Sequence, residues 1–150
     1  MTPFFCPHPG DTAHLGARLA ALLRPGDVVV LSGPLGAGKT LFTSGIAAGL
    51  GVEEPVISPS FILTREYSSG FLPLIHADIY RLATRNEFDD LDLLAQSSHG
   101  VLVIEWGDVV EPILPPDHLR VDFEVNDDEA RTITLVPFGG WQARVTELIA

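Results

Sequence analysis

The residue types best suited to chemistry are concentrated in one stretch of the chain. Residues 33–40 read Gly-Pro-Leu-Gly-Ala-Gly-Lys-Thr and follow Ser32 and the apolar run Val28–Leu31. This order predicts a buried strand, a glycine-rich loop and the first turn of a helix, which is the arrangement of a phosphate-binding P-loop. Glycine lets the backbone approach a phosphate closely, so that successive N–H groups and the helix N-terminus bind its oxygens.

Two side chains of this loop have expected roles. Lys39, the only lysine in the sequence, is expected to reach the β- and γ-phosphates of a nucleotide, and the Thr40 hydroxyl is expected on Mg²⁺. The alternative is a chance glycine-rich turn. Because every fixed position of the motif matches, in the expected strand-to-helix context, the sequence favours a nucleotide site.

Hydrolysis or transfer of a γ-phosphate also requires a carboxylate that positions Mg²⁺ or the attacking water. Glu105 is the strongest candidate, because it follows the apolar run Val101–Ile104 at the carboxyl end of a predicted strand, where open α/β sheets bind ligands. We expect it to contact Mg²⁺ directly or to polarise water. The alternative is an ordinary acidic residue at the surface end of a strand.

Several weaker candidates accompany these residues. His76 and Asp78 share one face of a strand end, and on their own they indicate a structural hydrogen bond more than a metal site. The segment Ser58–Phe61 is either a switch loop or a plain Ser/Pro turn. Arg131 is placed to reach a phosphate or the adenine edge, or else is a solvated hairpin arginine. Trp106, after Glu105, is predicted to be a packing residue, with contact to a partner as the alternative.

The elements that must position these residues alternate between helices and strands. Before residue 52 the predicted elements are, in chain order, the edge strand Thr2–Cys6, a helix with N-cap Asp11 or Thr12 that runs through Leu23, the P-loop strand, and a helix that begins at Lys39 and ends at Gly49 or Gly51. Further along they are the hairpin strands Phe61–Tyr67 and Phe71–His76, the acidic helix Asn86–Ala95, the buried strand Val101–Ile104, the hairpin strands Leu119–Val125 and Arg131–Val136, and an amphipathic helix from Trp141 to Ile149.

Composition sets limits on the class of protein. The 150 residues, 46% of them hydrophobic, predict one compact domain over residues 1–150. A net charge of −11 argues against direct binding to DNA or RNA, because no basic patch can neutralise phosphates. The single cysteine, Cys6, predicts a reducing compartment, and the chain shows no signal peptide or membrane-spanning run. We therefore expect a soluble, cytoplasmic protein without a membrane partner.

Together and in this order, these motifs resemble one family. The P-loop, Ser-Pro-Ser-Phe at Ser58–Phe61, His-Ala-Asp-Ile-Tyr-Arg-Leu at His76–Leu82 and Ile-Glu-Trp-Gly at Ile104–Gly107 are similar to those of TsaE, also called YjeE, a small bacterial P-loop ATPase of tRNA threonylcarbamoyladenosine synthesis. The resemblance spans nearly the whole chain. Ser60 departs from the family, which usually has threonine there, but the hydroxyl is kept.

The resemblance implies a fold and a function. The fold is a three-layer α/β P-loop NTPase with a mixed sheet, parallel at its centre and antiparallel at its edges. The function is ATP hydrolysis with Mg²⁺, slow without partners, in support of a complex with TsaD and TsaB. A protein of this family contacts tRNA only indirectly, through that complex, in which TsaD carries out the transfer chemistry.

The resemblance also assigns residues. The catalytic ones are Lys39, Asp78, beside the nucleotide and ordering water, and Glu105. The magnesium ligands are Thr40 and Glu105, and Ser58–Phe61 behaves as a switch. The nucleotide-binding residues are Gly33, Leu35, Gly36, Ala37, Gly38, Lys39, Thr40, Leu41, Asp78 and Arg131.

Two other functions stay open. A small-molecule phosphotransferase usually adds an arginine-rich lid, but the eight arginines of this chain are scattered. A nucleotide-gated binding module with little turnover would use ATP to fix the switch loop and recruit partners. A GTPase is disfavoured, because guanine recognition generally uses an Asn-Lys-x-Asp element and the sequence has no lysine besides Lys39.

Overall fold

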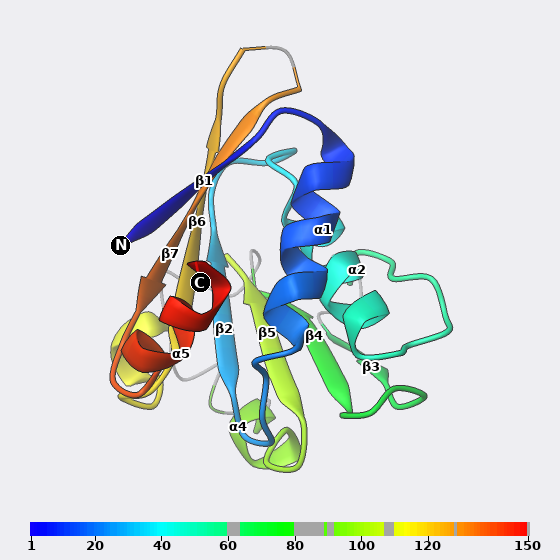
Figure 1. Cartoon of the computed structure of the whole chain (residues 1–150). Helices are drawn as coiled ribbons and strands as arrows, with labels where there is room; N and C mark the ends of the chain where they lie inside the picture. The colour runs from blue at the N-terminus through cyan, green and yellow to red at the C-terminus, as the bar shows by residue number, and fades with distance from the viewer. Residues whose placement is uncertain (60–63, 80–88, 90–91, 107–109, 128, 150) are drawn as a thin grey trace.

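The computed structural model describes residues 1–59, 64–79, 89, 92–106, 110–127 and 129–149 (Figure 1). Within them, seven strands form one sheet in the order β1-β7-β6-β2-β5-β4-β3. The strands are β1 (Thr2–Cys6), β2 (Val28–Ser32), β3 (Thr64–Tyr67), β4 (Leu74–Asp78), β5 (Val101–Glu105), β6 (Leu119–Val125) and β7 (Arg131–Pro137). The helices are α1 (Pro9–Ala20), α2 (Lys39–Gly49), α4 (Leu93–Gln96), the 3₁₀ turn η2 (Glu111–Ile113) and α5 (Trp141–Ile149).

The sheet is parallel at its centre and antiparallel at its edges. β2 pairs in parallel with both β5 and β6, and β4 pairs in parallel with β5. β7 and β1 continue one edge and β3 the other, each antiparallel to its neighbour. This arrangement confirms the predicted fold class, including the hairpin that directly follows the P-loop helix.

Apolar residues cover both faces of the central strands, which is why β2 and β5 are apolar along their length. One face packs against α1, α2 and α5 through residues such as Leu19, Phe42 and Trp141. The other face packs against α4 and the segment around η2 through residues such as Leu93 and Leu114. The protein therefore has three layers, as predicted.

Helix α1 begins and ends earlier than predicted. Its N-cap is His8, not Asp11 or Thr12, and Pro9 takes the first helical position, where its missing N–H is not needed. Asp11 instead accepts a hydrogen bond from the backbone N–H of His8 at 2.9 Å, as the third helical residue of a capping box does. Leu23 lies just after the turn that follows the helix, and its N–H bonds the carbonyl of Ala20 at 3.2 Å.

Helix α2 ends as predicted. Gly51 has φ +82°, a left-handed conformation that favours glycine. Its N–H bonds the carbonyl of Ala48 at 3.0 Å, and the N–H of Val52 bonds the carbonyl of Ala47 at 2.9 Å. These two bonds form a Schellman motif, which satisfies the last carbonyls of the helix.

Two predicted boundaries in the middle of the chain are wrong. The strand expected over Phe71–His76 begins only at Leu74 and reaches Asp78, because Phe71 lies in a turn with an 85% exposed side chain. The single helix expected over Asn86–Ala95 is interrupted at Asp92, whose φ of +54° no α-helix contains. Residues 86–88 and 90–91 of that prediction, and residues 61–63 of the first hairpin strand, lie outside the described residues.

No helix in the described part of the chain has the length and apolar character needed to cross a bilayer.

Candidate functional site

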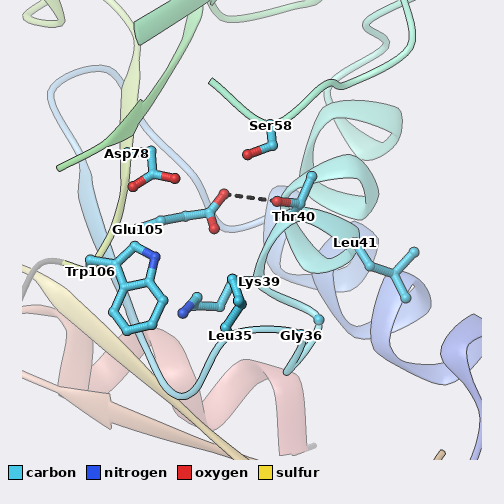
Figure 2. Close-up of a pocket in the computed structure, with 10 residues that line it drawn as sticks. Leu35, Gly36, Lys39, Thr40, Leu41, Ser58, Asp78, Glu105 and Trp106 are labelled. Carbon is cyan, nitrogen blue, oxygen red and sulfur yellow. Dashed lines mark hydrogen bonds between the residues drawn. The ribbon is translucent and has the colours of Figure 1, made fainter. Parts of the chain in front are cut away.

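The register of the central strands brings the candidate residues to one edge of the sheet. Leu31 of β2 pairs with Glu105 of β5, and Glu105 pairs with Asp78 of β4. These strands are parallel, so their carboxyl ends lie together beside the loop that follows β2. A cavity of about 250 Å³ opens there (Figure 2). It is lined by Leu35, Gly36, Gly38, Lys39, Thr40, Leu41, Ser58, Asp78, Glu105 and Trp106.

Two glycines of the loop are required by its geometry. A side chain at Gly33 would place its Cβ 2.8 Å from the carbonyl oxygen of Phe123, so any larger residue would push the loop away from β6. Gly38 is the N-cap of α2 with φ +102°, which other residues rarely adopt. No side chain caps α2, and its first N–H groups are the kind of donors that bind phosphate oxygens.

Lys39 lies in the wall of the cavity with only 4% of its surface exposed. Its ammonium group donates hydrogen bonds to the carbonyls of Gly33 at 2.6 Å and Pro34 at 3.4 Å. It also lies 3.3 Å from the centre of the Trp106 ring, a cation–π distance. These groups hold the positive charge at the loop, where it would meet phosphate oxygens.

The hydroxyl of Thr40 donates a hydrogen bond to Oε2 of Glu105 at 3.0 Å (Figure 2). The same carboxylate oxygen lies 2.5 Å from Nε2 of His76. Glu105 is 4% exposed and His76 is fully buried, so this group of three side chains links the first turn of α2 to the middle of the sheet.

The residues present fit a magnesium ion and a phosphate chain. Because the Thr40 hydroxyl donates its hydrogen bond to Glu105, its oxygen lone pairs are available, and hydroxyl and carboxylate oxygens suit Mg²⁺. In the described part of the chain no group of three or more His, Cys, Asp or Glu side chains could hold a metal. A cation at Thr40 and Glu105 would therefore need further ligands, and Mg²⁺ in nucleotide sites usually takes them from phosphates and water.

Comparison with known proteins gives a consistent result. A sequence model described as "Threonylcarbamoyl adenosine biosynthesis protein TsaE" matches residues 6–133. The "tRNA threonylcarbamoyladenosine biosynthesis protein TsaE" of Streptomyces coelicolor is 47% identical over 83% of this chain and 89% of its own length. The protein of that name from Bacillus subtilis is 40% identical over 88% of this chain and 83% of its own length.

A solved structure agrees with the sequences. The crystal structure of YdiB from Bacillus subtilis superposes with a TM-score of 0.81 at 34% identity, and covers 97% of this chain and 92% of its own. The chain belongs to the TsaE family. It is thus a member of a family of tRNA threonylcarbamoyladenosine biosynthesis proteins.

Not all nucleotide-binding residues expected in this TsaE chain line the cavity. Gly33 lies beside it and contributes its carbonyl to Lys39, and Ala37 is fully buried. Arg131, at the start of β7, lies against the outside of the loop: its guanidinium donates to the carbonyls of Ala37 at 3.2 Å and Gly36 at 3.3 Å. Arg131 and Ala37 line a neighbouring cavity of about 150 Å³ that also includes Gly36, Gly38 and Leu41.

Two contacts in this TsaE chain were not predicted from the sequence. A hydrogen bond was expected for His76 and is confirmed, but its partner Glu105 lies 29 residues further along the chain. The sequence favours a packing role for Trp106, and in the structure its ring lies over the ammonium group of Lys39. The φ of +62° at Trp106 is rare for a bulky residue, and no feature of the sequence predicts it. Of the predicted switch segment Ser58–Phe61, Ser58 lines the cavity and residues 60–61 lie outside the described residues.

Proposed function

We propose that this chain binds ATP with Mg²⁺ and hydrolyses it, as the ATP-hydrolysing subunit of tRNA threonylcarbamoyladenosine biosynthesis. One observation carries the proposal. The Thr40 hydroxyl, directly after the P-loop lysine, bonds the carboxylate of Glu105 at 3.0 Å in a cavity at the carboxyl edge of the sheet. Hydrolysis of a γ-phosphate needs a phosphate cradle, a cation site and a carboxylate within reach of one another.

Each residue then has a proposed role. Lys39 exchanges its bonds to the loop carbonyls for bonds to phosphate oxygens, with the α2 N-terminus beside it. Thr40 and Glu105 hold Mg²⁺, which when bound neutralises charge that develops on the phosphates. Asp78 lines the cavity next to Glu105, and we assign to it the orientation of the attacking water.

We further propose that the chain works with TsaB and TsaD and meets tRNA only through them. Family membership supports this assignment. The net charge of −11 also supports it, because a strongly acidic protein lacks the basic surface that binds nucleic acid by itself.

The test is ATP turnover with Mg²⁺, measured with the chain alone and with purified TsaB and TsaD. Slow turnover that the pair strongly stimulates is expected. Fast turnover that the pair leaves unchanged would contradict the partnership and indicate a stand-alone hydrolase or phosphotransferase. Nucleotide binding without turnover under both conditions would contradict the hydrolysis and indicate a nucleotide-gated module.

A binding measurement tests the phosphate site separately. Lys39→Ala removes a charge-assisted contact worth about 1.5–3 kcal/mol, which corresponds to a rise of roughly 10- to 150-fold in the ATP dissociation constant. Isothermal titration calorimetry measures it, with Arg65→Ala on the exposed part of β3 as a control that should bind as the unmodified protein does. Unchanged affinity in Lys39→Ala would contradict the P-loop assignment.

A further inference from the structure

His76 is a buried polar residue in a position that would ordinarily be apolar. It lies in the middle of β4, where all five residues are buried, and its own side chain is fully inaccessible to solvent. Nε2 lies 2.5 Å from Oε2 of Glu105, while Nδ1 has no hydrogen-bond partner among the described residues. Buried polar atoms without partners are rare and costly, so this histidine calls for an explanation beyond core packing.

The contacts indicate which ring nitrogen carries the proton. An ionised carboxylate only accepts hydrogen bonds, so Nε2 of His76 must be the donor to Glu105. If Nδ1 also carried a proton, that N–H would be a buried donor without a described partner. The contacts therefore favour a ring proton on Nε2, which leaves Nδ1 with one unfilled lone pair.

This proton acts on the orientation of the carboxylate. Oε2 of Glu105 accepts bonds from two directions, from His76 in the sheet and from Thr40 at the start of α2. No hydrogen bond within the described residues reaches Oε1, the oxygen that Figure 2 shows turned away from Thr40. Two donors on one oxygen fix the plane of the carboxylate, and the other oxygen stays available to a ligand in the cavity.

We propose that His76 is a positioning residue that holds the Glu105 carboxylate in the orientation needed for Mg²⁺ and nucleotide, an inference that rests on the proposed function. Partners in the shell outside a metal ligand orient that ligand, and their loss typically costs about 10- to 100-fold in metal affinity or activity. His76 touches neither nucleotide nor metal in this role. It acts only through Glu105.

The chain offers a matched control. His118 is a second buried histidine bonded to a glutamate, with Nε2 3.2 Å from Oε2 of Glu111, but it does not line the cavity. The side-chain nitrogen of glutamine reaches about as far as Nε2, whereas that of asparagine reaches only about as far as Nδ1. The informative variants are therefore His76→Gln, His76→Asn and His118→Gln.

Turnover gives the first readout, as a function of Mg²⁺ concentration and in the presence of TsaB and TsaD. His76→Asn should lower kcat or raise the Mg²⁺ requirement by about 10- to 100-fold, with little change in KM for ATP at saturating Mg²⁺. His76→Gln should restore most of the loss because it replaces the donor. His118→Gln should match the unmodified protein.

Binding gives a readout that does not depend on turnover. The affinity for ADP, measured by calorimetry with Mg²⁺ and with a chelator, should lose its Mg²⁺-dependent gain in His76→Asn and keep its value in the chelator. In the unmodified protein, the ¹⁵N resonances of the His76 ring should show the proton on Nε2.

The outcomes separate this inference from the proposed function. If the unmodified protein neither binds nucleotide nor turns it over, the proposed function fails. If it is active and a folded His76→Asn behaves identically at every Mg²⁺ concentration, only the role of His76 is overturned. Should His76→Asn not fold, the ring resonances decide, and a proton on Nδ1 instead of Nε2 would overturn the inference.

Discussion

Two histidine–glutamate pairs with a buried histidine lie within the described residues, one in the cavity wall and one beside η2. In the pair His118–Glu111 both ring nitrogens are bonded: Nδ1 to the carbonyl of Pro115 at 2.8 Å and Nε2 to the glutamate at 3.2 Å. The ring stacks on Phe138 with centroids 4.5 Å apart. In the pair His76–Glu105 the ring is more deeply buried, yet Nδ1 has no partner among the described residues.

The difference lies in what each glutamate is bonded to. Glu111 also accepts from Arg120 at 3.3 Å, so its charge is matched within the described fold. Glu105 has a threonine and a histidine as donors and no cationic partner within hydrogen-bond distance in the described residues, while its carboxylate borders a cavity. A fully satisfied network stabilises a fold, whereas a polar group left incompletely matched beside a cavity is typical of a ligand site.

The largest expected difference between the pairs is in catalysis. Glu105→Ala should retain ATP binding but lose roughly 100- to 1000-fold in kcat, because groups that position charge act mainly in the transition state. Glu111→Ala should leave kcat within about twofold, since it lies outside the cavity. Single-turnover hydrolysis with TsaB and TsaD measures both, and equal turnover in Glu105→Ala would remove that residue from the site.

The next difference is in stability. His118→Leu should lower the free energy of unfolding by about 2 kcal/mol, because it removes the partner of the Pro115 carbonyl and leaves Glu111 with Arg120 alone. His76→Leu should cost less, about 1 kcal/mol, because the loss of one donor to Glu105 is partly offset by an apolar side chain that suits a buried strand and by removal of the unmatched Nδ1. Urea unfolding monitored by circular dichroism checks this, and a greater loss in His76→Leu would show that the cavity pair is the structural one.

The smallest effect concerns Cys6, a buried ionisable group that belongs to neither pair. Burial raises the pKa of the Cys6 thiol above its ordinary value of 9.0, the Asp11 carboxylate adds to the rise, and a hydrogen bond with Thr12 opposes it. The folded state then holds the thiol proton more tightly than the unfolded state, so Cys6 should reduce stability only as the pH rises through 9.0. Labelling with a maleimide below that pH should be slow, and equally slow in both histidine variants.

The fold was predictable because its signals are local and mutually consistent. The apolar runs of β2 and β5 have the character of strands covered on both faces, and the alternation in β6 marks a half-buried strand. The glycine-rich loop required a strand before it and a helix after it. One error fell where a backbone torsion decides the structure, at Asp92 with φ +54°, because propensity does not report a single left-handed residue.

The site was predictable where a motif carries the chemistry and not where strand register does. Lys39, Thr40 and Glu105 follow from the P-loop and from the end of an apolar strand. The bond between His76 and Glu105 depends on β4 pairing with β5 so that Asp78 lies opposite Glu105. The sequence alone does not predict this strand register. The contact of Trp106 with Lys39 likewise depends on a φ of +62° at the tryptophan.

The position of the single lysine has a practical consequence for nuclear magnetic resonance. Protein grown with ¹³C,¹⁵N-lysine would contain one labelled residue, Lys39, and therefore one set of lysine signals in an otherwise silent background. Its ammonium end lies 3.3 Å from the centre of the Trp106 ring, so the aromatic ring current should shift its ε-methylene protons upfield. If the ammonium group moved from the indole to a bound phosphate, that signal would move back. The chemical shift of the labelled lysine would therefore report whether the phosphate site is occupied.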